Sequence, residues 1–573
     1  MNRRKWAVQF FQGLSLLLFA IVAFAFFTGG AVLRLGRLKL EMSALDPWMI
    51  TLILVVAAIH FGFKEKSVLL ENAKKTFSWL EDAPSGAMAL LMAVGVLGFL
   101  GHLARHLSFS VDTFDVSFVH PPLFNAFSNP FLKCDVCLGG ALPGEHLAFS
   151  FLLLAPIVNL LKDTAIHDYW IFLLQVVFLI GGLALLSIQG RLKDRKELWF
   201  SAILILLCHR AFRNAMVWDF REDVLAFFGF SLALFALYKG RLKLYFFGIV
   251  LAAISKENMA LVLPFLALPI YFSQDLSLTK IQRLVVAAAT VIFSVVYAYF
   301  SFKVFMPFFN PYGAGAHTIS SRFSAFGSTP ADVLKNVLFS PAAWWGLVSE
   351  KLLLLKVWKY LFLLLGPVLF LAYRKTWWLV PAVPGIAMNV FSSNQNQLTL
   401  QFHYDLLILP FLFFAAVLAL PNIAKRERQI ALLIALALSG RWPARALTEH
   451  WPTMAQVKDS FFLARVNSTG LLAADSNLMP QVSQMSALRV LATPETPVLV
   501  SAQDVWPEFL KRQTEDLTRL PDRKFVLADR FLFDLKNPWH EKLVQVAATQ
   551  PGFWLEERSP SGRYQIVNRI TPR

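Results

Sequence analysis

The residues best suited to chemistry lie in one polar stretch, residues 102–146, with apolar segments on both sides. The stretch contains four histidines, a Cys-x-x-Cys pair, the aspartates Asp112 and Asp115, and a Gly-Glu-His triplet with Glu145 and His146. Carboxylates and imidazoles transfer protons in general acid–base catalysis, and ionisable groups held beside membrane helices commonly mark functional sites. We therefore interpret residues 102–146 as the active-site loop of a polytopic membrane enzyme.

Asp112 and Asp115 are three positions apart, so a locally helical loop would put both carboxylates on one face. Such a pair could act as a general base or as metal ligands. The alternative is structural, because acidic loop residues often cap short helices.

Cys134 and Cys137, with His120 and His146 nearby, could form a zinc site. Structural zinc sites normally use a second pair of ligands at a clear spacing, and the sequence offers only scattered histidines. A local disulfide in an oxidising compartment is the second interpretation, and a pair of free thiols is the third.

Three later polar segments also place charges beside apolar runs, at residues 210–223, 255–258 and 401–405. An arginine or lysine there can bind a phosphate, and a histidine can donate to it or relay a proton. Each segment also has a structural interpretation, as a self-paired salt bridge or as part of an interfacial aromatic belt. The candidate substrate-binding residues in these segments are Arg213, Asp219, Arg221, Glu222, Lys256, Glu257, His403 and Tyr404.

The composition is that of a membrane protein, because 57% of the 573 residues are hydrophobic and only 16% are charged. The net charge of +17 lies largely in short loops between apolar runs, which favours cytoplasmic anchoring over nucleic-acid binding. Three cysteines are too few for a disulfide scaffold. The sequence has no P-loop, GxGxxG, GxSxG or HExxH motif for soluble nucleotide or hydrolase chemistry.

The apolar runs predict about 13 transmembrane helices, with the N-terminus in the cytoplasm and the first span retained. The run at residues 147–161 is too short to cross, so we expect it to lie along the interface or to re-enter. This topology puts residues 102–146, 210–223, 255–258, 307–356, 392–405 and the chain after about residue 440 outside the cytoplasm. The potentially reactive residues would then meet at the outer face.

The domain organisation that follows has four parts. Residues 1–101 form N-terminal transmembrane helices, and residues 102–162 form the extracytoplasmic active-site loop with its interfacial helix. Residues 163–440 form the transmembrane core. In residues 441–573 short apolar runs alternate with helical patterns, which predicts a small extracytoplasmic α/β domain.

The order of the polar segments resembles a family of predicted membrane proteins catalogued as domain of unknown function twenty seventy-nine. Its pattern has Phe-Asp, then Gly-Asp/Glu-His before an apolar run that ends in Ala-Pro, then Asp-Phe-His-x-Glu, Lys-Glu-Asp and His-Tyr. Similar elements here are Phe114-Asp115, Gly144-Glu145-His146, Ala155-Pro156, Asp219-Phe220-Arg221-Glu222, Lys256-Glu257-Asn258, His403-Tyr404 and the tail at residues 473–480. Arg221 stands where the family has His, and Asn258 stands where it has Asp.

That family is similar to a branch of the GT-C glycosyltransferases, membrane enzymes that take sugars from polyprenyl-phosphate carriers. The resemblance implies an α-helical, GT-C-like fold and an essential acidic residue in the first large outer loop, which here is Asp115. Asp115 would deprotonate the acceptor hydroxyl. Glu145 and His146 would complete the acceptor side, where the need for a divalent metal ion is left open.

We therefore predict a glycosyltransferase of the bacterial cytoplasmic membrane that acts at the outer face. Arg221, Lys256 and His403 would neutralise the carrier phosphate as it leaves. The predicted partners are a polyprenyl-phosphate-linked sugar, the bilayer and a glycan, lipid or protein acceptor, with no nucleic acid. The alternatives are a transporter or flippase of a lipid-linked or anionic substrate, which would be expected to show matching halves, and a non-catalytic envelope assembly partner.

Overall fold

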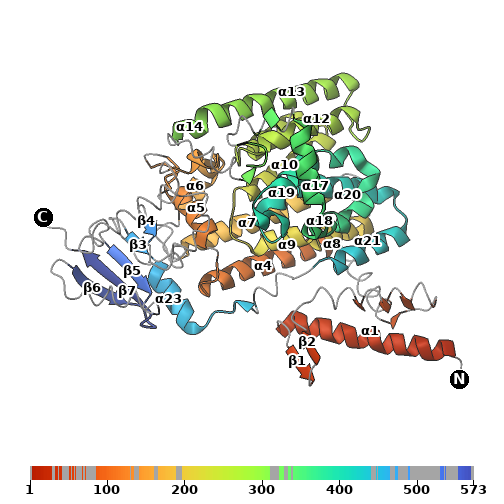
Figure 1. Ribbon diagram of the computed structural model, residues 1–573, viewed down its shortest axis with the longest axis horizontal. Coiled ribbons are helices and arrows are strands. Elements are labelled where there is room, and N and C mark those ends of the chain that lie inside the picture. The colour runs from red at the N-terminus through yellow and green to blue at the C-terminus, as the bar shows by residue number, and fades with distance from the viewer. Residues whose placement is uncertain are drawn as a thin grey trace.

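A computed structural model gives the arrangement of the chain (Figure 1). Apart from isolated positions between these ranges, it describes residues 3–28, 32–35, 38–41, 86–111, 113–128, 131–134, 141–160, 166–188, 196–309, 322–327, 340–439, 449–464, 472–474, 488–490, 530–534 and 553–569. Asp112 and Cys137 lie outside the described residues.

Helices dominate the described part of the chain, as the composition predicts. Four are long and apolar enough to cross a membrane: α4 (Gly86–Leu107), α7 (His167–Ser187), α13 (Lys280–Tyr299) with its continuation to Phe309, and α18 (Leu355–Ala372) with its continuation to Leu379. A fifth span is formed if α8 (Lys196–Leu207) and α9 (Arg210–Val217), which are bent by 66°, cross together. The number of about 13 crossings stays a prediction.

Shorter apolar helices fill the space between these spans. They are α10 (Asp223–Tyr238), α11 (Leu242–Ala253), α12 (Met259–Phe272), α19 (Ala382–Phe391) and α20 (Leu409–Ala419). Helices α1 (Arg3–Thr28), α5 (Thr113–Phe124), α17 (Pro341–Leu352) and α21 (Lys425–Ala437) complete the larger elements of this part. Figure 1 shows α4 to α21 gathered in one helical body, and one large hydrophobic cluster runs through it.

Helix α6 (Phe151–Asn159) occupies the apolar run that the sequence leaves as interfacial or re-entrant. Its nine residues extend about 13.5 Å, less than half of the hydrocarbon thickness of a bilayer. Its length therefore suits a helix that does not cross, although its place relative to the bilayer stays a prediction.

A mixed five-stranded sheet lies in the C-terminal part of the chain, in the order β4-β3-β5-β7-β6. Strand β3 (Leu472–Ala474) pairs in parallel with β4 (Leu488–Val490) and β5 (Arg530–Asp534). Strand β7 (Tyr564–Arg569) pairs antiparallel with β5 and β6 (Phe553–Arg558). Together with α23 (Met454–Ala464), these strands are the described elements of the predicted α/β domain, whose full extent stays a prediction.

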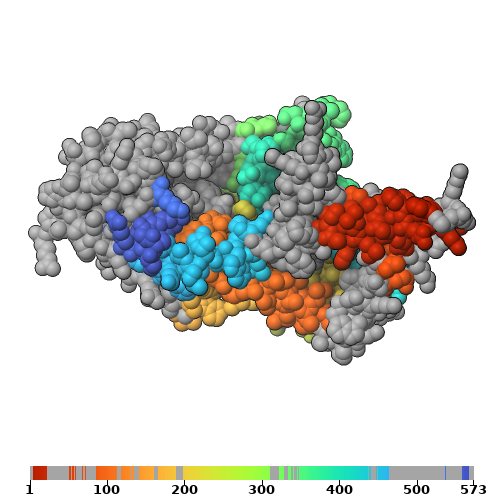
Figure 2. All heavy atoms as spheres, turned by 90° about the horizontal axis from the view of Figure 1, so that it is seen from below, coloured from red at the N-terminus to blue at the C-terminus, as the bar shows by residue number. Residues whose placement is uncertain are grey.

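The C-terminal part packs against the end of α4. The Gln456 side chain of α23 donates to the Ser108 carbonyl at 3.2 Å, and the rings of Phe109 and Tyr564 lie 5.4 Å apart. Figure 2 shows residues 454–464 beside α4. A separate antiparallel hairpin, β1 (Val32–Leu35) and β2 (Leu38–Glu41), follows α1.

Helices α10 and α11 form a tight antiparallel hairpin that positions the site described below. Gly240 ends the turn with a φ of +67°, a conformation that glycine adopts without a Cβ clash. Gly229 and Gly248 then face each other across the two helices, and a Cβ on either would lie 2.7 Å from a backbone nitrogen of the other helix. Small residues at such crossings let helix backbones approach closely in membrane proteins.

Gly229→Ala is expected to weaken this hairpin, because the atoms that its Cβ would meet belong to the backbone and cannot move aside alone. The expected loss is about 1–3 kcal/mol, measured as a lower Tm of the purified protein in detergent. Gly13→Ala on α1, where a Cβ meets nothing within 4 Å, is the matched control and should keep its Tm. A Gly229→Ala protein as stable as wild type would contradict this close packing.

Candidate active site

A buried lysine, Lys256, forms the centre of a cluster of charged side chains. Its Nζ lies 2.7 Å from Glu222 Oε1 and 2.7 Å from Asp223 Oδ2. Both carboxylates stand at the start of α10, and Lys256 lies in the short connection between α11 and α12. The hairpin of α10 and α11 therefore brings residues more than 30 positions apart to the same level.

Two further residues extend this cluster. Arg221 Nε lies 3.3 Å from Glu222 Oε2, and His403 Nε2 lies 3.7 Å from Asp223 Oδ2. His403 is carried by η7 (His403–Leu407), a short 3-10 helix that packs against α10. All of these side chains are buried, so their charges are compensated mainly by one another.

The neighbouring residue Glu257 holds His146. His146 Nδ1 lies 3.1 Å from Glu257 Oε1, and the Leu147 N–H donates to Glu257 Oε2 at 3.1 Å. The Ser150 N–H donates to the Ile254 carbonyl at 3.0 Å and fastens the same two segments together. Glu145, also buried, follows η3 (Leu142–Gly144) in this loop.

Burial opposes the charges of this cluster, and its members respond differently. It raises the pKa of Asp223 and lowers the pKa of His403 well below its usual value, both toward the neutral form, whereas three other groups are held charged by their partners. Burial alone would raise the pKa of Glu257, but the charge and hydrogen bond of His146 hold that pKa below its usual value. Burial likewise opposes ionisation of Glu222, where Arg221 and Lys256 outweigh it and hold the pKa well below its usual value. For Lys256, the nearby carboxylates Asp223 and Glu222 overcome burial and raise the pKa of the ammonium group.

Several buried polar atoms around the cluster have no hydrogen-bond partner among the described residues. They are both ring nitrogens of His403, Ser150 Oγ and Asn258 Oδ1. Buried polar groups are nearly always paired in folded proteins, by protein atoms, by water or by a ligand. The cluster therefore has spare capacity to bind a polar molecule.

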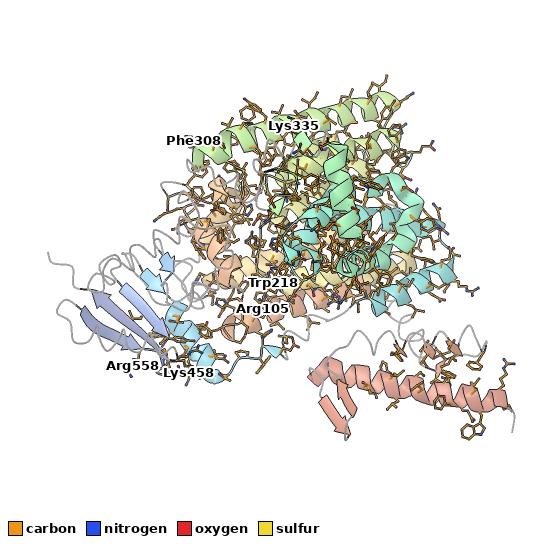
Figure 3. The ribbon with its side chains drawn as sticks, viewed as in Figure 1. Arg105, Trp218, Phe308, Lys335, Lys458 and Arg558 are labelled. Atoms are coloured by element: carbon orange, nitrogen blue, oxygen red, sulfur yellow. The ribbon has the colours of Figure 1, made fainter. Side chains whose placement is uncertain are left out.

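Asp219, a predicted substrate-binding residue, is bound instead to Arg105 at the end of α4. Arg105 Nη1 lies 3.3 Å from Asp219 Oδ1, and the same guanidinium donates to the carbonyls of Val217 and Ser110. It also stacks over the Trp218 ring at 4.9 Å, and Figure 3 shows the two side chains together. Arg105 thus fixes the segment that leads into Arg221 and Glu222, a role that the sequence analysis did not assign.

The remaining predicted residues are placed as follows. Arg213 is buried in α9. Tyr404 lies next to His403, with ring centroids 4.3 Å apart, and the Arg322 guanidinium stands 5.9 Å from the Tyr404 ring. Asp115 is in α5, but its side chain lies outside the described residues, as does the whole of Asp112. The roles of both aspartates stay predictions.

The histidines of the polar stretch do not stay together. His146 pairs with Glu257, whereas His106 and His120 lie 3.7 Å and 2.8 Å from the carboxylate of Asp168 on α7. His167 pairs with the same carboxylate at 3.0 Å. No sequence motif marks His167 or Asp168, because their partners are supplied by helices far away in the chain.

The sequence leaves three interpretations of Cys134 and Cys137, namely a zinc site, a local disulfide and a pair of free thiols. Cys134 is disulfide-bonded, which agrees with the second of them. Cys208 is a buried free thiol. Within the described ranges, no group of three or more His, Cys, Asp or Glu side chains has the arrangement of a metal site.

Asp405, two residues after His403, is hydrogen-bonded to uncharged side chains and does not belong to the charged cluster. Its Oδ1 accepts hydrogen bonds from Tyr360 Oη at 2.8 Å and from Asn389 Nδ2 at 3.1 Å. Burial raises the pKa of Asp405 to about 7, although both hydrogen bonds favour the charged form. This network joins η7 to α18 and α19 and holds His403 in place.

The raised pKa of Asp405 predicts a pH-dependent stability. Between its ordinary pKa of 3.8 and about 7, the folded protein keeps a proton that the unfolded chain releases, so stability falls as pH rises through this window. Asp405→Asn retains the acceptor oxygen without the charge, and we expect its Tm to exceed that of wild type at about pH 8 and to approach it near pH 4.

Asp275→Asn is the control of opposite sign, because the Asp275 carboxylate is hydrogen-bonded to Lys375 and Ser273, and its pKa is lowered despite partial burial. The stability that the Asp275 carboxylate contributes is present above its ordinary pKa of 3.8 and is lost only at lower pH, so that variant should be less stable than wild type to a similar extent at about pH 8 and near pH 4. Thermal unfolding in detergent across this range measures both. An Asp405→Asn protein with the pH dependence of wild type would show that Asp405 is not the source.

The helical body, with its apolar spans and its buried polar cluster, is that of a polytopic membrane protein. A solved structure of similar fold is ArnT from Cupriavidus metallidurans in the apo state, with 14% identity and a TM-score of 0.50 over 86% of this chain and 100% of that chain. A crystal structure of ArnT bound to undecaprenyl phosphate aligns with 12% identity and a TM-score of 0.49, over 85% and 100% of the two chains.

The profile of the predicted membrane protein family DUF2079 matches residues 140–497, and the chain belongs to this family. The resemblance seen in the order of the polar segments is thereby confirmed. A search of curated proteins finds no match. At identities this low, the likeness to ArnT establishes the fold alone.

Proposed function

We propose that this protein transfers a sugar from a polyprenyl-phosphate carrier to an acceptor at the outer face of the bacterial cytoplasmic membrane. The observation that carries the proposal is the buried cluster around Lys256, where three polar segments from separate parts of the chain meet. Charged groups beside membrane helices are costly to keep, which is why they usually mark a substrate site or pathway. The GT-C-like fold is consistent with this reaction class.

The proposed binding of the carrier phosphate uses hydrogen-bond capacity that the cluster leaves open. The Lys256 ammonium group has three N–H donors, and Glu222 and Asp223 account for two of them. The third donor of Lys256 and the ring nitrogens of His403 have no hydrogen-bond partner among the described residues. A charge-assisted donor from Lys256 and an N–H of the His403 imidazole suit a phosphate whose negative charge grows as the sugar leaves.

The cluster does not offer bare positive charge. Arg221 and Lys256 carry two positive charges, and Glu222 and Asp223 sit within hydrogen-bonding or ion-pair distance to balance them. The phosphate would therefore be recognised by directed hydrogen bonds. The ion pair with Glu222 would hold the Arg221 guanidinium in position. Such a preorganised arrangement needs little rearrangement during the reaction.

On the acceptor side, Asp115 is the proposed general base. It would take the acceptor proton while the acceptor oxygen attacks the anomeric carbon and the carrier phosphate leaves, which inverts the configuration at that carbon. The carboxylate of Glu145 and the flanking Asp112 would complete this side. The sugar, the acceptor and any divalent metal ion belong to the part of the proposal that experiment must supply.

Asp115→Asn is expected to remove transfer activity, because an amide cannot accept the proton and a positioned base typically contributes 10²–10⁴-fold. Lipid-linked sugars and surface glycans would be measured by mass spectrometry in cells that lack the protein. A glycan that disappears in these cells should return with wild type and stay absent with Asp115→Asn at equal membrane levels.

Glu427→Gln is the matched control, because Glu427 forms an exposed ion pair with Arg374. This variant should restore the glycan fully. If Asp115→Asn also restores it, the base assignment is wrong and transport or scaffolding becomes the better account. An unchanged set of glycans in the deleted cells would contradict glycosyl transfer itself.

A further inference from the structure

The geometry of His146 and Glu257 singles out one atom, His146 Nε2. Glu257 binds this segment with both oxygens, one at His146 Nδ1 and one at the Leu147 N–H, each at 3.1 Å. The imidazole is therefore fixed in orientation. Its other nitrogen, Nε2, has no partner among the described residues and is not among their fully buried unpaired atoms. The side chain as a whole is 10% exposed.

A carboxylate at Nδ1 fixes which nitrogen carries a proton. Because ionised Glu257 can only accept a hydrogen bond, Nδ1 must be protonated, and Nε2 is left as the atom that exchanges protons. A carboxylate in this position also stabilises the doubly protonated imidazolium, as in hydrolase triads. Nε2 then carries a hydrogen that can be donated to an anion.

The charged groups that face His146 are mainly acidic. Glu257 and Glu222 both interact with its positive charge. Lys256 faces the same region but is held by Glu222 and Asp223. Among the described residues, the titratable groups that interact with the pair are Glu222 at the start of α10, Lys256 in the connection before α12, and Tyr297 on α13. Glu145 precedes His146 in the same loop.

The pairing also changes the side of the reaction to which His146 belongs. The sequence alone places His146 with Glu145 on the acceptor side. The structure joins it to Glu257, the immediate neighbour of Lys256, and so to the group of residues proposed to receive the carrier phosphate.

We propose that His146 is the proton donor to the departing carrier phosphate and that Glu257 is its positioning residue. This inference rests on the proposed function. As the bond between the anomeric carbon and the phosphate oxygen breaks, its electron pair stays on that oxygen, which accepts the Nε2 proton of the imidazolium. The acceptor oxygen forms the new bond to the anomeric carbon and gives its proton to Asp115, so the two proton transfers balance and water resets both groups.

The test measures binding of undecaprenyl phosphate to the purified full-length protein in nanodiscs, from about pH 5.5 to about pH 9. Wild type should bind more weakly as pH rises, because the imidazolium loses its Nε2 proton. His146→Gln, which keeps a neutral N–H donor, should bind roughly tenfold more weakly at the acidic end. The advantage of wild type over His146→Gln should then disappear at the alkaline end, where Nε2 has no hydrogen to donate and the Gln amide still has one. This loss separates histidine titration from titration of the phosphate itself.

Glu257→Gln tests whether Glu257 acts through the charge of His146, because a merely structural role of Glu257 would not shift the pH dependence of binding. Without the carboxylate, the imidazolium is less favoured, so the pH dependence of binding should persist but move to lower pH. His120→Gln, which removes a carboxylate-paired histidine from the Asp168 group, is the matched control and should bind like wild type. Undecaprenol, which lacks the phosphate, should bind wild type and His146→Gln equally at every pH.

The outcomes separate the two levels of the proposal. If wild type fails to bind undecaprenyl phosphate at any pH, the proposed function fails. If wild type binds but His146→Gln matches it at every pH, or if wild-type binding strengthens relative to His146→Gln as pH rises, the function survives and the donor role of His146 is overturned.

Discussion

The structure depends on one interaction, the sharing of the Lys256 ammonium group between Glu222 and Asp223. Three buried charges at the ends of apolar helices are stable only together, because each one alone would face a desolvation penalty of several kcal/mol. Removing one member of a buried pair typically costs about 3–5 kcal/mol, since the partner is left uncompensated. The ion cluster therefore fixes the relative positions of the helix ends that carry it.

That constraint extends outward through specific contacts. The close approach of α10 and α11 at Gly229 and Gly248 sets the distance between Asp223 and Lys256. Glu257, next in the chain, then orients His146, and Asp223 meets His403 on η7. Arg105 holds the preceding segment through Asp219. A polar site is thus built from short connections, each held by a helix whose apolar surface is buried.

Much of this could be predicted from sequence because charged residues stand out against apolar runs. The segments with Arg221, Lys256 and His403 were expected to meet, and the structure brings them together. Which acidic residue pairs with which cation could not be predicted. Arg105 and Asp219 are 114 positions apart, and such a pairing depends on how helices cross rather than on any local pattern.

The histidines illustrate the same limit. Four of them in one polar stretch suggested a single site, but His146 joins Glu257, whereas His106 and His120 join Asp168, which has no sequence motif. Hydropathy identifies apolar runs, but it does not show which of them cross the membrane. Short helices such as α6, α11 and α19 are apolar and yet lack the length of a full span. Chain order was therefore a better guide to the family than to the detailed topology.

The central claim is that the cluster around Lys256 receives the phosphate of a polyprenyl carrier. The most direct measurement is a cryo-EM structure of the full-length protein in nanodiscs that contain undecaprenyl phosphate. The account predicts density for the phosphate within hydrogen-bonding distance of Lys256, His403 and His146. Phosphate density at another part of the protein, with this cluster unoccupied at saturating lipid, would contradict it.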